Sequence, residues 1–183
     1  MRRKAAFLER DGVINVDRAH VHRAEDFDLL PGVMSAMELL RGDGYVLVVV
    51  TNQSGIARGF YTEEDYRRVT DYMRSLFARH GIRLDGVYHC PHHPEGQIER
   101  YRRVCDCRKP GAALVRKAMS ELHIDPAASM MVGNSLADVQ AGRAAGVGHC
   151  YLIAHGKDVR QREADGVFPS LLECARSVCA QVR

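Results

Sequence analysis

The chain has 183 residues, of which 46% are hydrophobic and 27% charged, and a chain of this size forms one domain with a core of its own. Lysine and arginine together number 26 and aspartate and glutamate 23, so the net charge is only +3. Because acidic and basic residues are interleaved, this balance argues against a nucleic-acid-binding arm and a polybasic membrane anchor. It remains compatible with a small anionic ligand, and we expect a single domain over residues 1–183.

From the hydropathy pattern we expect neither a membrane span nor an export signal. No apolar run approaches the ~20 residues that cross a bilayer, and only Ala5 to Leu8 follow the basic start before charges return. A secretory signal has a longer apolar region. We therefore expect a monomer in the reducing cytoplasm, where disulfides are rare, with neither nucleic acid nor a membrane as its partner.

Short apolar runs alternate with segments of helical periodicity. In chain order, the apolar runs predict strands at 5–8, 45–50, 86–90, 129–132 and 148–153. The periodic segments predict helices near 33–40, from 62 to Gly81, over 114–122, from 135 and over 169–182, with loops at 91–108 and 160–165. Thr62 with Asp65, and Ser135 with Asp138, have the spacing of helix caps. This alternation predicts an α/β, Rossmann-like three-layer fold with a mostly parallel sheet.

Ligands of such a sheet bind outside the carboxyl ends of its strands, so the polar residues that follow the strands are the candidate site. Four segments qualify: 9–15 with its two carboxylates, 51–55 with a hydroxyl and turn residues, 108–111 with two cations, and 133–138 with a helix cap. Taken singly, each is also typical of solvated acids, a capped loop or surface charge. Pro110 favours an extended Lys109 that projects from its loop.

Together and in this order, the four segments resemble the haloacid dehalogenase superfamily of phosphotransferases. Its pattern is Asp-x-Asp after the first strand, Thr or Ser after the second, a later Lys, and an acidic Gly-Asp-x-x-x-Asp motif. Further motifs resemble its heptose-bisphosphate phosphatases, with histidinol-phosphate phosphatases as near relatives. These motifs are Asn15-Val16-Asp17, the run from Val50 to Gly59, Cys90-Pro91-His92-His93-Pro94 and Cys105-Asp106-Cys107-Arg108-Lys109-Pro110.

The resemblance extends from Phe7 to about Ile153 and implies a Mg²⁺-dependent phosphatase without a large cap domain, acting on a phosphorylated sugar through a carboxyl-phosphate intermediate. It implies that Glu9 occupies the nucleophile position, that Asp11 is the general acid/base, and that Thr51 and Lys109 bind the phosphoryl group. The residues that it assigns to substrate recognition are Asp17, Arg18, Ala19, His20, Asn52, Gln53, Ser54 and Arg108. It assigns Mg²⁺ to Glu9, Asp11 and Asn134, with Asp138 as a further candidate.

Two positions depart from the superfamily pattern. Glu9 and Asn134 stand where the pattern has Asp. The extra methylene of Glu9 displaces the carboxylate by roughly 1 Å, a misplacement that can cost ~10²-fold in rate, and Asn134 removes a charge from a hard-cation site. We therefore expect an intact phosphate pocket with impaired catalysis. The alternatives are a catalytically silent phosphoester-binding protein on the same scaffold and a histidinol-phosphate phosphatase.

A cluster of thiols and imidazoles lies in the loop at about 90–108. Cys90, His92, Cys105 and Cys107 offer the three thiolates and one imidazole of a closed tetrahedral Zn²⁺ site. The resemblance implies the same zinc loop, and His93 is the competing ligand. A surface loop with reduced thiols is the alternative. A bound zinc ion would order the segment that leads into Arg108 and Lys109.

Overall fold

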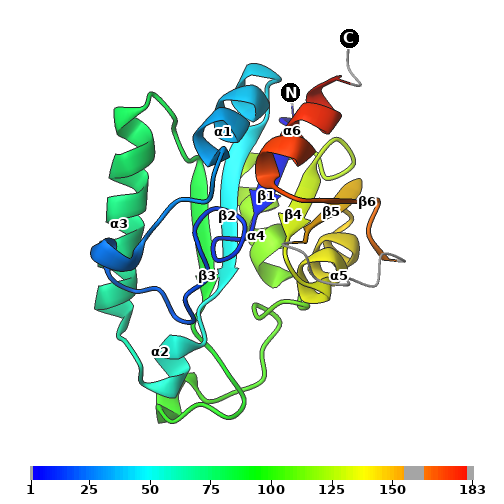
Figure 1. The fold of residues 1–183 in the computed structure, drawn as a ribbon. Coiled ribbons are helices and arrows are strands. Elements are labelled where there is room, and N and C mark those ends of the chain that lie inside the picture. Colours follow the sequence, from blue (N-terminus) through cyan, green and yellow to red (C-terminus); the bar gives the residue numbers. More distant parts are fainter. Residues whose placement is uncertain (1, 155–162, 181–183) are drawn as a thin grey trace.

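A computed structural model describes residues 2–154 and 163–180, and in these ranges the chain forms a six-stranded sheet covered by helices (Figure 1). All strand pairs are parallel, in the order β3-β2-β1-β4-β5-β6. The strands are β1 (Ala5–Leu8), β2 (Val46–Asn52), β3 (Gly86–Cys90), β4 (Met130–Gly133), β5 (His149–Ile153) and β6 (Gly166–Phe168). The predicted α/β three-layer fold is confirmed.

The central strands are apolar on both faces because helices cover both faces of the sheet. Leu47 and Val49 of β2 belong to one buried cluster, whereas Val48 and Val50 belong to the other. This alternation follows from the two-residue period of a strand. The unbroken valine run that predicted the strand is therefore buried on both sides.

Two helical layers enclose the sheet. The helices are α1 (Val33–Gly42), α2 (Gly55–Arg58), α3 (Glu63–Arg79), α4 (Ala113–Leu122), α5 (Leu136–Ala145) and α6 (Leu171–Ala180). Apolar residues of α1, α3 and α6 join one cluster, and those of α4 and α5 join the other. Helices α1 and α6 come from distant parts of the sequence but pack side by side (Figure 1). Among the described residues, none of the helices is long and apolar enough to span a membrane.

Both expected helix caps are present. Thr62 Oγ1 accepts a hydrogen bond from the Asp65 amide at 3.1 Å, and the Asp65 carboxylate accepts from the Thr62 amide at 2.9 Å. At α5, the Asp138 carboxylate accepts from the amide and the hydroxyl of Ser135, at 3.0 and 2.7 Å. The bonds at α3 are reciprocal, whereas both bonds at α5 run from Ser135 to Asp138, and each set satisfies amide groups at a helix start.

Several boundaries differ from the expected ones. Strand β2 continues to Asn52, so Thr51 lies within the sheet, and the short elements α2 and β6 were not expected. Strand β6 has only three half-buried residues, which gives no periodicity to detect. Of the loop expected at 160–165, residues 160–162 lie outside the described ranges, as do residues 181 and 182 of the last expected helix.

The strand order creates a topological switch point between β1 and β4. The chain proceeds from β1 outward through β2 to β3, and then returns to the other side of β1 to form β4, β5 and β6. Connections leaving neighbouring strands in opposite directions open a crevice at their carboxyl ends, where ligands bind in such sheets. The residue that follows β1, Glu9, donates its amide to Val132 O at 3.0 Å and so sits at this point.

Candidate active site

A pocket of about 310 Å³ opens at the carboxyl ends of β1, β2 and β4. Its wall consists of Glu9, Asp11, Asp17, Ala19, His20, Asn52, Gln53, Ser54, Tyr61, Asn134, Ser135 and Asp138. Most of these residues come from the segments that follow the strands, which therefore do meet at one edge of the sheet. The pocket lies at the switch point between β1 and β4.

The ammonium group of Lys109 is buried behind this pocket between two carboxylates. Its Nζ contacts the Glu9 carboxylate, Asp138 Oδ1 at 2.6 Å and Val50 O at 2.8 Å. The Lys109 side chain is only 1% exposed. The alternative in which Lys109 is ordinary surface charge is therefore wrong, because two carboxylates and a strand-end carbonyl hold its ammonium inside.

The single ammonium of Lys109 faces two buried carboxyl groups, and the pKa of one of them, Glu9, is raised. Burial raises the pKa of Glu9 to about 7, with the Asp138 charge adding to the increase and Lys109 opposing it. Burial also disfavours the charged form of Lys109, but Asp138 and Glu9 outweigh it and raise the pKa of Lys109. The pocket therefore contains a carboxyl group whose charged form is disfavoured next to a firmly protonated ammonium.

The Asp11 carboxylate lies at the pocket wall and is held from several sides. Its Oδ2 accepts hydrogen bonds from Gln53 Nε2 and Arg10 Nη2, both at 3.0 Å, and its Oδ1 accepts from Asn15 Nδ2 at 2.9 Å. The Arg10 side chain is 1% exposed and also donates to Val21 O at 2.6 Å. Asp11 retains 18% exposure, so it is oriented by its partners and still accessible from the pocket.

The groups that could hold Mg²⁺ gather at the same wall. The Asn134 carboxamide contacts the backbone carbonyl of Asp11, with Nδ2 donating at 3.1 Å, and the Asn134 amide donates to Asp138 Oδ2 at 3.1 Å. With the Glu9 carboxylate, these groups form a set of oxygen donors from carboxylates, a carbonyl and a carboxamide. Hard divalent cations take such donors, so the residues present fit Mg²⁺.

Asp17, Ala19 and His20 form one rim of the pocket, and Arg18 of the same segment does not line it. Asp17 Oδ1 accepts from the Ala19 amide at 2.9 Å, and Ala19 and His20 have φ of 54° and 68°. These left-handed conformations turn the chain so that the His20 ring lies 4.8 Å from the Phe60 ring. Arg18 instead pairs with Asp28 at 2.7 Å in solvent and does not line the pocket.

The remaining expected residues differ in their distance from the pocket. Asn52 and Ser54 line it, and the Asn52 carboxamide bridges the backbone of Lys109 through bonds of 3.0 and 3.1 Å. Thr51 is fully buried and reaches the site by contacting the Glu9 carboxylate. Arg108 is half-buried and is not among the residues of the pocket wall.

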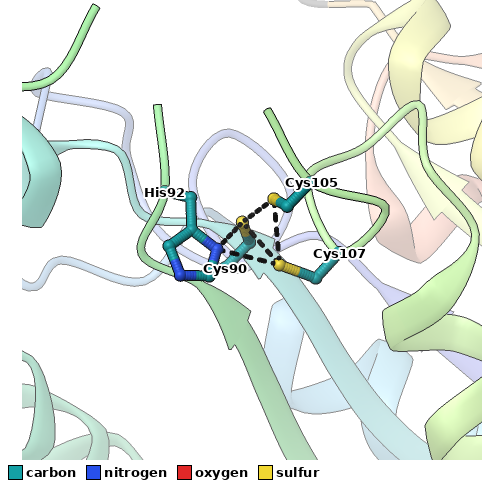
Figure 2. A group of neighbouring side chains, drawn as sticks. All are labelled: Cys90, His92, Cys105 and Cys107. Atoms are coloured by element: carbon teal, nitrogen blue, oxygen red, sulfur yellow. Dashed lines mark hydrogen bonds between the residues drawn. The ribbon is translucent and has the colours of Figure 1, made fainter. Parts of the chain in front are cut away.

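Cys90, His92, Cys105 and Cys107 form a compact cluster (Figure 2). Cys90 ends β3, and the other three residues belong to the segment that follows. The contacts among the three Sγ atoms and His92 Nδ1 range from 3.1 to 3.7 Å, and all four atoms lie within 4.8 Å of one another. Ligand atoms about 2.3 Å from a tetrahedral Zn²⁺ would be roughly 3.8 Å apart. The donor set therefore fits zinc.

His93, the competing zinc ligand, lies outside this cluster. Its Nε2 contacts Arg58 Nη2 at 3.0 Å, and its Nδ1 accepts from the Glu95 amide at 3.1 Å. Of the two adjacent histidines, His92 therefore provides the imidazole.

Comparison with known proteins connects this geometry to one family. The model of the haloacid dehalogenase-like hydrolases matches residues 2–146. The D-glycero-beta-D-manno-heptose-1,7-bisphosphate 7-phosphatase of Salmonella typhi is 48% identical over 180 residues, which cover 97% of this chain and 96% of that protein. The protein of the same name from Escherichia coli K12 is 47% identical over 180 residues, covering 97% and 94%.

The chain belongs to the haloacid dehalogenase-like hydrolase family. A solved structure gives the same result: D,D-heptose 1.7-bisphosphate phosphatase from B. bronchiseptica, complexed with magnesium and phosphate, superposes with a TM-score of 0.84. It is 30% identical, and the match covers 97% of this chain and 99% of that one. The resemblance deduced from the strand-end motifs is confirmed, and the chain is a phosphoric monoester hydrolase by family.

Two side chains of this hydrolase site were not expected from the sequence. Arg10 lies between two acidic residues, a pattern typical of solvated charge, yet it is buried against Asp11. Tyr61 precedes a helix cap and is apolar in character, yet it lines the pocket and donates its hydroxyl to Gln53 Oε1 at 2.5 Å. The only sequence signal was their proximity to the strand-end motifs.

Proposed function

We propose that this chain removes the 7-phosphate of D-glycero-D-manno-heptose 1,7-bisphosphate through a carboxyl-phosphate on Glu9. The main observation in support is the Lys109 ammonium at the switch point, where it contacts both Glu9 and Asp138. A cation beside a strand-end carboxylate attracts a phosphoryl group to the carboxylate oxygen that attacks it. The names of the relatives that are 47 and 48% identical over 97% of the chain support the choice of substrate.

In the first step, a Glu9 oxygen forms a bond to phosphorus while the bond from phosphorus to the sugar oxygen breaks. Asp11, at the pocket wall, transfers a proton to the departing sugar oxygen. Lys109 and the Thr51 hydroxyl, both in contact with Glu9, donate to the phosphoryl oxygens as negative charge develops on them.

In the second step, a water molecule attacks the phosphorus of the carboxyl-phosphate. Asp11 removes a proton from that water, and the bond between phosphorus and the Glu9 oxygen breaks. Inorganic phosphate leaves, and the Glu9 carboxylate returns to its contact with Lys109. Asp11 thus acts first as an acid and then as a base, which its partial exposure at the wall permits.

The Glu9 carboxylate, the Asp11 carbonyl and the Asn134 carboxamide oxygen would hold Mg²⁺, with Asp138 beside them. When bound, the ion supplies positive charge that neutralises phosphoryl oxygens. Substrate recognition would fall to Asp17, Ala19, His20, Asn52 and Ser54, which line the pocket, with Arg18 and Arg108 contributing from outside its wall.

We also propose that the four-residue thiol and imidazole cluster binds a structural Zn²⁺. A closed set of four protein ligands leaves no position for chemistry, so the ion would act by ordering the loop. Arg108 and Lys109 follow Cys107 directly. The zinc loop would thereby fix the backbone that delivers the buried ammonium to the active site.

A catalytically silent phosphoester-binding protein is the second candidate, and the side chains of Glu9 and Asn134 are the observation that favours it. Both differ from the superfamily pattern at the nucleophile and metal positions. Such a protein would retain the phosphate-binding groups Thr51 and Lys109 and would bind the substrate without turnover.

Phosphate release from a panel of substrates distinguishes these candidates. The panel contains both anomers of the heptose bisphosphate, the heptose 7-phosphate and histidinol phosphate, each with Mg²⁺ and with EDTA. Mg²⁺-dependent release from the bisphosphate supports the phosphatase, binding without release supports the silent protein, and preferential release from histidinol phosphate would overturn the substrate assignment.

The proposal includes a monomer that acts in the reducing cytoplasm. The six cysteines, all without disulfides, support that compartment, and sedimentation of the purified chain measures the oligomeric state.

A further inference from the structure

The side chain of Gln53 is buried between Asp11 and Thr51, the general acid/base and a phosphoryl-binding residue of the proposed mechanism. Its Nε2 donates to Asp11 Oδ2 at 3.0 Å and to Thr51 Oγ1 at 2.9 Å. Its Oε1 accepts from the Tyr61 hydroxyl at 2.5 Å and from Arg10 Nη2 at 3.4 Å. A carboxamide has two N–H donors and two acceptor lone pairs, so these four bonds use its full capacity. Gln53 has no hydrogen-bonding group left for a substrate.

The chemistry of its neighbours fixes the orientation of this amide. The guanidinium of Arg10 can only donate, so it needs an acceptor, and the amide oxygen is the acceptor that the carboxamide offers. The amide nitrogen must therefore face Asp11 and the amide oxygen must face Arg10. Burial raises the pKa of Tyr61, so its hydroxyl remains protonated and donates to the same oxygen.

This orientation also determines the direction of the Thr51 hydroxyl. Because Thr51 Oγ1 accepts a hydrogen bond from Gln53 Nε2, its own proton points in another direction. The other group that this hydroxyl contacts is the carboxyl of Glu9, whose oxygens can accept its proton in a hydrogen bond. The Thr51 proton is thus directed toward the position of the nucleophile, where a phosphoryl oxygen would receive it.

We propose that Gln53 is a positioning residue that is held by Tyr61. It orients the side chains of Asp11 and Thr51 on either side of the reacting phosphoryl group. This inference rests on the proposed phosphatase function and differs from the direct substrate contact that the resemblance implies for Gln53. The buried residue acts through two other side chains, so its loss should lower kcat rather than raise KM.

A double-mutant cycle tests the coupling. Gln53→Met keeps the shape of the side chain but removes all four hydrogen bonds, and a displacement of about 1 Å at Asp11 or Thr51 would lower kcat by on the order of 10²-fold. Tyr61→Phe removes only the hydroxyl that holds the amide and should lower kcat by a smaller factor. In the double variant the second change should add little. Tyr66→Phe is the matched control, because it removes another buried tyrosine hydroxyl that is not a hydrogen-bond partner of Gln53.

Two kinetic outcomes would overturn the inference. A Gln53→Met variant whose loss lies mainly in KM would identify Gln53 as a direct substrate ligand. Additive effects of the Gln53 and Tyr61 variants on kcat would show that the two side chains act separately.

Nuclear magnetic resonance of the ¹⁵N-labelled chain tests the same network without turnover. The Gln53 side-chain NH₂ signals, identified by their loss in Gln53→Met, should exchange slowly with water and shift in Asp11→Asn. They should exchange faster in Tyr61→Phe. Rapidly exchanging signals that respond to neither substitution would refute the network. Absence of phosphate release from the parent chain would instead refute the proposed function, and the NH₂ signals would still decide the arrangement of Gln53.

Discussion

Replacing Glu9 and Asn134 with aspartate should raise the catalytic rate of this site. Glu9→Asp shortens the side chain by one methylene, which withdraws the carboxylate by roughly 1 Å. In the structure, the longer side chain brings the Glu9 carboxylate into contact with Lys109, which also binds Asp138 at 2.6 Å. Withdrawal of the Glu9 carboxylate opens space between itself and the ammonium, which a phosphoryl oxygen can occupy.

The expected gain follows from this displacement. A misplacement of about 1 Å in a reacting group costs on the order of 10²-fold in rate, so Glu9→Asp with Asn134→Asp should raise kcat by about that factor. The assay is Mg²⁺-dependent phosphate release from the heptose bisphosphate at saturating substrate. Glu38→Asp, which removes the same methylene from an exposed helical residue, is the matched control and should leave kcat unchanged. If the double variant gains nothing over the parent, the assigned nucleophile and metal positions are wrong.

Three further perturbations test the surroundings of the site. Removing zinc with a chelator should weaken binding of the substrate and lower the melting temperature, because the zinc loop orders the backbone before Lys109. Unchanged substrate affinity in verified zinc-free protein would show that the zinc loop does not support substrate binding. Lys109→Met should lower the free energy of unfolding by about 3–5 kcal/mol, the usual cost of leaving buried carboxylates without their cation. Urea unfolding measures this change. A decrease of less than about 1 kcal/mol, which is typical of exposed ion pairs, would contradict the burial of the pair. Gly12→Ala and Gly81→Ala both place a side chain at positive φ, each costing about 1–2 kcal/mol. Only the first would press on Asn134 Nδ2, 2.1 Å from the added Cβ, so only Gly12→Ala should raise the Mg²⁺ concentration needed for half-maximal activity.

Local patterns predicted the parts of the fold that local physics determines. The β2 valine run and the Thr62 and Ser135 caps depend on neighbours within a few residues, and sequence spacing shows these directly. The three-residue β6 depends instead on pairing with β5 and has no pattern of its own. The sequence could not indicate it.

The candidate site divides in the same way. The strand-end motifs indicated which residues meet, because parallel strands bring their carboxyl ends to one edge. The burial of Lys109 depends on Glu9, 100 residues away in sequence, and the Gln53 bond to Asp11 spans 42 residues. In both pairs, the residue far away in the sequence leaves no trace in the sequence pattern around its partner. A buried ammonium and an internal amide therefore look like ordinary loop residues until the chain is folded.

The two departures from the superfamily pattern should act on different steps, because only one of them changes the charge. Around the metal donors, Glu9 and Asp138 are the acidic groups and Lys109 is the basic group, whereas the carboxamide of Asn134 is neutral. Asn134→Asp adds a negative charge to an oxygen ligand of Mg²⁺, and affinity for hard cations rises with ligand charge. Alone, it should lower the Mg²⁺ concentration for half-maximal activity and leave kcat at saturating Mg²⁺ little changed. Glu9→Asp keeps the charge and moves the carboxylate, so alone it should raise kcat with little change in the Mg²⁺ requirement. The opposite pattern would mean that Glu9 limits metal binding and Asn134 limits the chemistry, which would reverse the roles assigned to them.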